Sequence, residues 1–309
     1  MNLFIERKTC PICKSEKTEE IITRTFQDQD FVDFTKLEPT YKAAFYADFE
    51  KGILKNQIFK VVKCLQCKFL YQQYVLNDEG MSRLYNVWMD HTVVEALSGG
   101  PKVKQKAIRY FQDRVVYVQN HFKQKKINIL DWGAGLGTFC MAAKNVNPGD
   151  VYAYDFSSEK NKHLEQLGII TKSLEELPKK YFHFINIDQV LEHVSDPLDL
   201  IDTATKYLTD DGVIFISVPL CNTVEKSFRN NILDKKAFEQ LQPHQHINAF
   251  TNKTLKAIGK EAGLKTLFEP FKQIRTSSTD GSDLKEHAKN VIKPFYRQWI
   301  STALYFQKT

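Results

Sequence analysis

The sequence predicts an α/β fold: a doubly wound, mostly parallel sheet preceded by a small cysteine-rich module. Short apolar segments alternate with helical segments over residues 127–218, which is typical of a parallel sheet covered by helices. The last of these segments, residues 212–218, is almost uniformly apolar, as expected of a strand with both faces buried. Four of the six cysteines form two Cys-x-x-Cys pairs near the N-terminus, and these predict the separate module.

The composition indicates a globular chain. It has 309 residues, 42% of them hydrophobic, enough to bury one large domain and a smaller one. The net charge of +6 is not clustered, which argues against nucleic-acid binding and suits a small anionic substrate. No apolar run approaches the roughly 18 residues of a membrane span, and the start lacks a signal-peptide pattern. We therefore expect a cytoplasmic protein with reduced cysteines.

The two cysteine pairs predict a metal site. Cys10 and Cys13 form one pair, and Cys64 and Cys67 form the other. Four thiolates on two tight turns make a closed tetrahedral zinc site, whereas a redox pair would stand alone at a strand-to-helix junction. Free thiols or another metal remain alternatives. The long segment between the pairs contains two expected strands, residues 20–26 and 57–63, and aromatic residues that form a small core or a lid.

A glycine-rich turn after the apolar segment at residues 127–131 predicts a cofactor site. Gly133, Gly135 and Gly137 lack Cβ atoms, so backbone amides and a helix N-terminus can approach a ligand closely. A dinucleotide fingerprint would need its third glycine at the position of Thr138. Asp131 before the turn would repel a pyrophosphate but suits a cationic ligand. The pattern therefore favours S-adenosylmethionine.

Further acidic residues fall at predicted strand ends, where ligands of such sheets bind. Asp155 lies 20 residues after Gly135 and could accept both ribose hydroxyls of an adenosine, with Phe156 beside it. A solvated surface aspartate is the alternative. Asp188 ends the next long strand. These residues extend the predicted cofactor site across neighbouring strands.

The remaining elements follow from periodicity and turn signals. Residues 102–122 carry apolar side chains at three- and four-residue steps and predict a helix with one buried face. Residues 284–306 are expected to form one or two helices around Pro294, which pack on the sheet or join a homodimer. The other expected helices are 139–146, 158–167, one beginning at 190–194, and 251–262; the other expected strands are 151–154, 169–171, 182–187 and 264–268.

Three motifs together resemble those of class I S-adenosylmethionine-dependent methyltransferases. They are the segment 129–137 with its glycines, the Leu-Glu-His-Val-Ser-Asp-Pro stretch at 191–197, and Phe250-Thr251 followed by Ala262-Gly263-Leu264. The cysteine pattern, with the Lys-Phe-Leu-Tyr stretch after Cys67, further resembles zinc-containing methyltransferases of nucleotide-linked deoxysugars.

The resemblance implies roles for several residues. The three glycines would hold the methionine part of the cofactor, Asp155 the ribose, and Asp188 the amino-acid end. Ser173 and Leu174 would contact adenine, although the family often has an acid where Ser173 stands. The implied organisation is a zinc-binding module at 1–90, a linker and packing helix at 91–126, a Rossmann-like S-adenosylmethionine-binding domain at 127–270 and a helical tail at 271–309.

A histidine segment is the expected source of a general base. In the sugar C-methyltransferases a Tyr-His-Glu-His stretch supplies it, and Pro243-His244-Gln245-His246 occupies that place. His244 and His246 point to opposite sides of an extended chain, so we expect one of them, His246, to act. A structural histidine is the alternative. The segment itself offers no third residue that would complete a metal site with the pair.

The acceptor is expected to be small and anionic. Lys226, Arg229, Lys235 and Lys236 lie in an insertion and could meet a diphosphate. The resemblance implies methyl transfer to a carbon or hydroxyl of a nucleotide-linked sugar. Two alternatives remain: the same chemistry on a lipid, quinone or other metabolite, and a silent methyltransferase-like domain that binds a protein partner through its zinc module.

Overall fold

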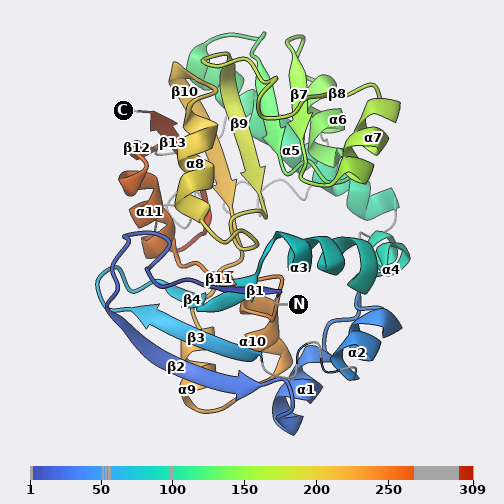
Figure 1. The fold of residues 1–309 in the computed structure, drawn as a ribbon. Coiled ribbons are helices and arrows are strands. Elements are labelled where there is room, and N and C mark those ends of the chain that lie inside the picture. The colour runs from blue at the N-terminus through green and yellow to red at the C-terminus, as the bar shows by residue number, and fades with distance from the viewer. Residues whose placement is uncertain are drawn as a thin grey trace, which may run out of the picture. The chain divides into compact units, whose positions relative to one another are not determined.

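The computed structural model describes residues 3–50, 52, 54, 57–97, 101–267 and 299–308, which pack into two compact units (Figure 1). The sheet unit consists of Lys102–Val190, Asp199–Val218 and Gly259–Thr309. The cysteine unit consists of Met1–Pro101, Leu191–Leu198 and Pro219–Ile258. The module that the cysteines predict therefore includes two later segments, one of which carries the histidines. Within the described ranges, no helix is both long and apolar enough to cross a bilayer.

The sheet unit contains a seven-stranded sheet in the order β12-β13-β10-β9-β6-β7-β8. Strands β6 to β10 pair in parallel, whereas β13 is antiparallel to both of its neighbours. The prediction of a mostly parallel sheet is thus confirmed. The strands are β6 (Ile129–Trp132), β7 (Val151–Tyr154), β8 (Ile170–Thr171), β9 (Phe182–Asp188), β10 (Leu208–Ser217), β12 (Leu264–Leu267) and β13 (Ala303–Lys308).

Strand β6 lies at the point where the strand order reverses. Strands β7 and β8 extend the sheet on one side of it, and β9 and β10 extend it on the other. A crevice outside the carboxyl ends of the strands forms at such a switch point. The glycine turn after β6, Asp155 after β7 and Asp188 at the end of β9 therefore share one edge of the sheet.

Helices cover both faces of this sheet (Figure 1). On one face α5 (Pro101–Phe122), α6 (Thr138–Lys144) and α7 (Ser158–Gln166) share a core with alternate residues of the strands, among them Ile129, Val213 and Phe215. The other face carries α8 (Pro197–Thr205) and α11 (Asn252–Glu261). Gly259 of α11 sits so close to β13 that an added Cβ would lie 2.4 Å from the Phe306 ring.

The expected C-terminal helices are wrong for the last residues of the chain, because Ala303–Lys308 forms strand β13. Leu304, Tyr305 and Phe306 are consecutive and all at most 3% exposed. A strand with both faces covered can bury three successive side chains, which explains why this segment forms a strand and not a helix. Residues 271–298 of the predicted tail, including Pro294, lie outside the described residues, so the role of the tail remains untested.

The helix expected to begin at 190–194 starts later, at Pro197 of α8. Residues 191–194 form a turn whose carbonyl groups are taken by the segment at β11 (Asn248–Ala249). Asn248 donates its side-chain amide to the carbonyls of Leu191 and Val194, and the Ile247 N–H donates to Glu192 at 2.8 Å. Proline is favoured at the first position of a helix, which explains why α8 begins at Pro197.

The cysteine unit is built on a four-stranded antiparallel sheet in the order β11-β4-β3-β2, from β2 (Thr18–Thr25), β3 (Ile58–Cys64), β4 (Leu70–Gln72) and β11. Strands β1 (Phe4–Glu6) and β5 (Tyr74–Leu76) form a separate pair. The aromatic residues gather in one core, as Phe31, Phe34, Phe45, Phe59 and Trp88 are all at most 2% exposed. The helices are α1 (Gln29–Thr35), α2 (Ala43–Glu50), α3 (Asp78–Arg83), the π-helix η1 (Leu84–Trp88), α4 (His91–Leu97), α9 (Val224–Arg229) and α10 (Lys235–Gln240).

Candidate cofactor, metal and catalytic sites

The glycine turn has the backbone geometry that its sequence predicts. Gly133, Gly135 and Gly137 have φ angles of +80°, +54° and +74°, in the left-handed region that favours glycine. An added Cβ at Gly133 would lie 2.5 Å from Val190, whereas one at Gly135 would meet no atom within 4 Å. Gly135 therefore faces open space, where a ligand can approach the backbone.

Asp155 holds this turn in place as well as standing at the tip of β7. One carboxylate oxygen accepts a hydrogen bond from the Gly135 N–H at 2.8 Å, and the other accepts from the Ser157 N–H at 2.9 Å. The residue is 7% exposed, whereas the neighbouring Phe156 is 75% exposed. A carboxylate has about four lone pairs, so both oxygens can still accept ribose hydroxyls. Phe156 offers an aromatic face beside them.

Asp131 makes buried contacts near the end of β6, and its role toward the cofactor remains a prediction. It is 3% exposed, and its oxygens accept from the Asn186 amide at 2.7 Å and from the Cys140 thiol at 3.3 Å. Burial raises the pKa of Asp131 to about 7. Its contacts show a structural contribution, since they fix the end of β6 against β9 and α6.

Arg114 is the residue of this site that the sequence analysis missed. Its guanidinium donates to Asn186 and, at 2.8 Å, to the Asp188 carboxylate, which is 21% exposed. It also lies 3.7 Å from the centre of the Phe215 ring. The available signal was its position on the apolar face of α5, three residues after Phe111 and four residues before Val118. Arg114 joins the buried Asp131 network to Asp188 at the edge of the sheet.

The two residues expected to contact adenine lie on a turn before β9. Ser173 is exposed, and its N–H donates a hydrogen bond to the Glu176 carboxylate at 3.0 Å. The carbonyl of Leu174 accepts from the Tyr207 hydroxyl at 2.6 Å. These contacts shape the turn, and their role toward adenine remains a prediction.

The four cysteines of the two pairs come together. All four Sγ atoms lie within 4.8 Å of one another, with Cys10 and Cys67 at 3.5 Å and Cys13 and Cys64 at 3.5 Å. Sulfurs about 2.3 Å from a tetrahedral zinc ion would be about 3.8 Å apart, so the set fits zinc. The pairs form matched turns, each followed by a lysine with positive φ, 56° at Lys14 and 66° at Lys68.

His246 lies in a small polar cluster of the cysteine unit. Its ring is 5.0 Å from that of His193, between ring centres, and Glu192 stands beside His193. Burial lowers the pKa of His246, so the neutral imidazole is favoured. His193 was not among the predicted site residues, because its contact with a segment some 50 residues later cannot be read from the motif.

His244 occupies a different environment from His246. It is 3% exposed and stacks on Phe26 with ring centres 5.3 Å apart, among Phe4, Phe45 and Trp88. Burial lowers its pKa to about 3. A histidine enclosed by aromatic rings fits the alternative of a structural residue, so His246 stays the candidate base of this segment.

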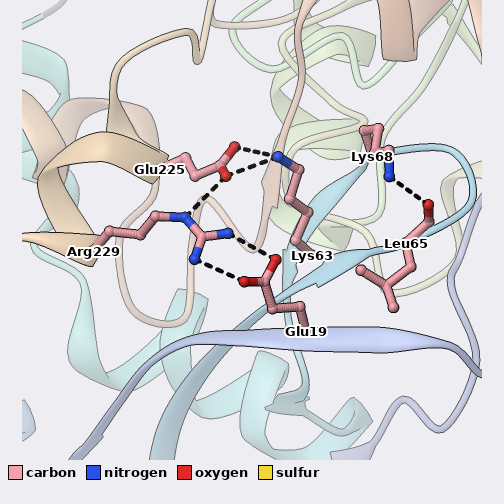
Figure 2. A network of polar contacts seen from close by, with 6 residues as sticks. All are labelled: Glu19, Lys63, Leu65, Lys68, Glu225 and Arg229. Carbon is pink, nitrogen blue, oxygen red and sulfur yellow. Dashed lines mark hydrogen bonds and ion pairs between the residues drawn. The ribbon is translucent and has the colours of Figure 1, made fainter.

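One expected anion ligand is already engaged. Figure 2 shows Arg229 of α9 between two carboxylates, Glu19 at 2.8 Å and Glu225 at 3.1 Å, with Lys63 2.8 Å from Glu225. Nearby, the Lys68 ammonium donates to the Leu65 carbonyl. A bidentate Arg–Glu pair gives geometric order as well as energy. Arg229 therefore ties α9 to strand β2 of the four-stranded sheet. The other three expected anion ligands, Lys226, Lys235 and Lys236, are exposed.

Comparisons with known proteins identify the family. The family model described as "Methyltransferase domain" matches residues 104–268, more than half of the chain. The chain belongs to this family. Together with the strand order and the glycine turn, the match confirms the predicted enzyme class, an S-adenosylmethionine-dependent methyltransferase of class I.

Solved structures with similar folds include other methyltransferases. A putative sarcosine dimethylglycine methyltransferase from Galdieria sulphuraria is 18% identical, with 66% of this chain and 86% of that chain covered and a TM-score of 0.44. The plantazolicin methyltransferase BpumL in complex with SAH is 14% identical, with 74% and 93% covered and a TM-score of 0.49. A SAM-dependent methyltransferase from Archaeoglobus fulgidus is 18% identical, with 71% and 100% covered and a TM-score of 0.43. No curated protein matches the sequence significantly.

Proposed function

We propose that the enzyme transfers a methyl group from S-adenosylmethionine to a carbon or hydroxyl of a nucleotide-linked sugar. The observation that carries the cofactor assignment is the open space at Gly135 beside the Asp155 carboxylate and the exposed Phe156 ring. When bound, the cofactor supplies an electrophilic methyl group on a sulfonium. The protein then needs to align an acceptor and remove a proton.

Each cofactor contact is assigned to a residue of the sheet unit. Backbone groups of the glycine turn would hold the methionine part, and the remaining lone pairs of Asp155 would accept the ribose hydroxyls. Phe156 would stack on adenine, with Ser173 and Leu174 at its edge. Asp188, oriented by Arg114, would accept from the cationic amino group.

Zinc held by the four cysteines is proposed to be structural. Cys10, Cys13, Cys64 and Cys67 fill a tetrahedral ligand set, which leaves no open position for a substrate. Such an ion would fix the two turns relative to each other and close the long loop between the pairs. Its contribution is to the stability of the cysteine unit.

His246 is proposed as the general base. A neutral imidazole can accept the acceptor's proton, and burial favours that neutral form. We expect His246→Gln to lower kcat about 10²- to 10⁴-fold without changing cofactor affinity. His163→Gln, at an exposed position of α7, is the matched control. The acidic limb of the wild-type pH–rate profile should lie below the usual histidine value of about 6.5.

The acceptor class is tested by mass spectrometry on a panel of compounds. The resemblance of the cysteine module and the exposed cations Lys226, Lys235 and Lys236 support a nucleotide sugar. A gain of one methyl group on a nucleotide sugar, dependent on S-adenosylmethionine, is the expected result. Methylation of only a lipid or quinone in the panel would refute the sugar assignment, and cofactor binding without turnover on any compound would refute catalysis.

A further inference from the structure

The cluster of Glu192, His193 and His246 has the composition of a second metal centre. The turn at 191–194 contributes two of these side chains and the segment before β11 contributes the third. One potential ligand atom from each residue lies within 4.8 Å of the other two. We propose that these three side chains bind one first-row divalent cation. This site is separate from the four cysteines and goes beyond the proposed methyl transfer.

The distances are compatible with ligation. His193 Nε2 and Glu192 Oε1 are 3.7 Å apart. Ligand atoms about 2.1 Å from a tetrahedral ion are separated by about 3.4 Å, and those around an octahedral ion by about 3.0 Å. Small side-chain rotations therefore suffice to bring the three atoms around one ion.

Both imidazole rings are oriented as metal-binding histidines are. The Nδ1 atom of His193 is 3.0 Å from the Gln245 carbonyl oxygen, and that of His246 is 3.3 Å from the Glu239 carbonyl oxygen. A ring that donates its Nδ1–H to a backbone carbonyl carries its lone pair on Nε2. The two carbonyls thus favour the tautomer in which Nε2 of each ring carries the lone pair that a cation needs.

The backbone around the ligands is firmly held. The Ile247 and Asn248 N–H groups donate to the Glu192 carbonyl, and the Asn248 side-chain amide donates to the carbonyls of residues 191 and 194. The buried Arg7 guanidinium adds bonds to the Ser195 carbonyl at 3.1 Å and the Ile247 carbonyl at 3.0 Å. A site with fixed ligands loses little conformational entropy when an ion binds.

Burial and charge favour a cation. Glu192 is 1% exposed and places a carboxyl group on the inner side of the cluster, which an ion would hold in its charged form, whereas the His193 side chain is 23% exposed. An ion would therefore have protein ligands on one side and access from the other. Two imidazoles and one carboxylate prefer Zn²⁺, Co²⁺, Ni²⁺ or Fe²⁺ over Mg²⁺ and Ca²⁺, which take oxygen ligands.

Coordination has a consequence for His246. The same Nε2 lone pair would either bind the cation or accept a proton, so the two events exclude each other. Metal occupancy would thus inhibit proton removal by His246.

Cobalt titration tests the site. Co²⁺ is added to the full-length protein with the cysteine site filled by zinc, and binding is followed by calorimetry and visible absorption. We expect one Co²⁺ per chain with weak bands typical of nitrogen and oxygen ligands, while the zinc content stays constant. Glu192→Gln, His193→Gln and His246→Gln should each weaken binding at least tenfold, since even changes behind the ligands cost about 10- to 100-fold. His163→Gln should bind as the wild type does.

Two results would overturn the proposal: no Co²⁺ binding by the zinc-filled wild type, or equal binding by all three variants. Because Glu192 is buried, His193→Gln at a more exposed position keeps the test valid if Glu192→Gln does not fold. The titration contains neither S-adenosylmethionine nor an acceptor. A negative result would therefore leave the proposed methyl transfer intact, and failure of methyl transfer would leave the metal site intact.

Discussion

Arg114 holds Asp188 at the edge of the sheet that is proposed to bind the cofactor, and Arg114→Met tests this supporting role directly. The substitution keeps much of the side-chain volume but removes the bonds to Asn186 and Asp188. Arg114 is only 2% exposed at its side chain. Removing one partner of a buried ion pair costs about 3–5 kcal/mol. Because the Asp188 side chain is 21% exposed and can recover some hydration, we expect about 3 kcal/mol.

Urea unfolding followed by circular dichroism measures this change, with Arg109→Met as the control on the exposed side of the same helix. The control should change the free energy of unfolding by less than about 0.5 kcal/mol. In Arg114→Met, a further Asp188→Asn substitution should recover part of the loss, because no buried charge is then left without its partner. Equal stability of Arg114→Met and Arg109→Met would refute the supporting role.

Three further predictions concern the other sites. Cys13→Ser should lower the zinc content from about one equivalent and reduce the thermal stability of the cysteine unit, and full zinc content in this variant would contradict the proposed ligand set. Burial lowers the pKa of His244 to about 3, so its contribution to stability is complete above about pH 6.5 and is lost as the pH falls toward 3. The unfolding free energy of His244→Phe should therefore fall less steeply with acid than that of the wild type. An unchanged slope of unfolding free energy against pH would contradict this prediction. Phe156→Ala should weaken S-adenosylmethionine binding about tenfold, the value of one base–aromatic stack, with no change in stability because the ring is exposed; unchanged affinity by calorimetry would exclude stacking.

The parts of the fold that depend on local patterns were predictable from the sequence. The turn at Gly133, Gly135 and Gly137 needs positive φ, and the sequence places glycine at each position. The apolar strands and the paired cysteines likewise carry their signals within a few residues. The conformation of the glycine turn and the close approach of the four cysteine sulfurs agree with these local signals.

Features that depend on contacts between distant segments were not predictable. Arg114 meets Asp188 across 74 residues, and His193 meets the Gln245 carbonyl across 52 residues. No local period records such pairs. The C-terminal strand was missed because the short apolar run at 304–306 fits a buried strand or a helix equally well until its neighbours in the sheet are known.

The most direct test of the central claim is calorimetry of S-adenosylmethionine binding to the wild type and to Gly135→Ala. A Cβ at Gly135 would project into open space at a φ of +54°, which costs an alanine only about 1–2 kcal/mol of backbone strain. We predict one cofactor bound per wild-type chain and at least tenfold weaker binding by the variant, because the methyl group would occupy the space of the ligand. Absence of binding by the wild type, or equal binding by both proteins, would contradict the assignment of the glycine turn as the cofactor site.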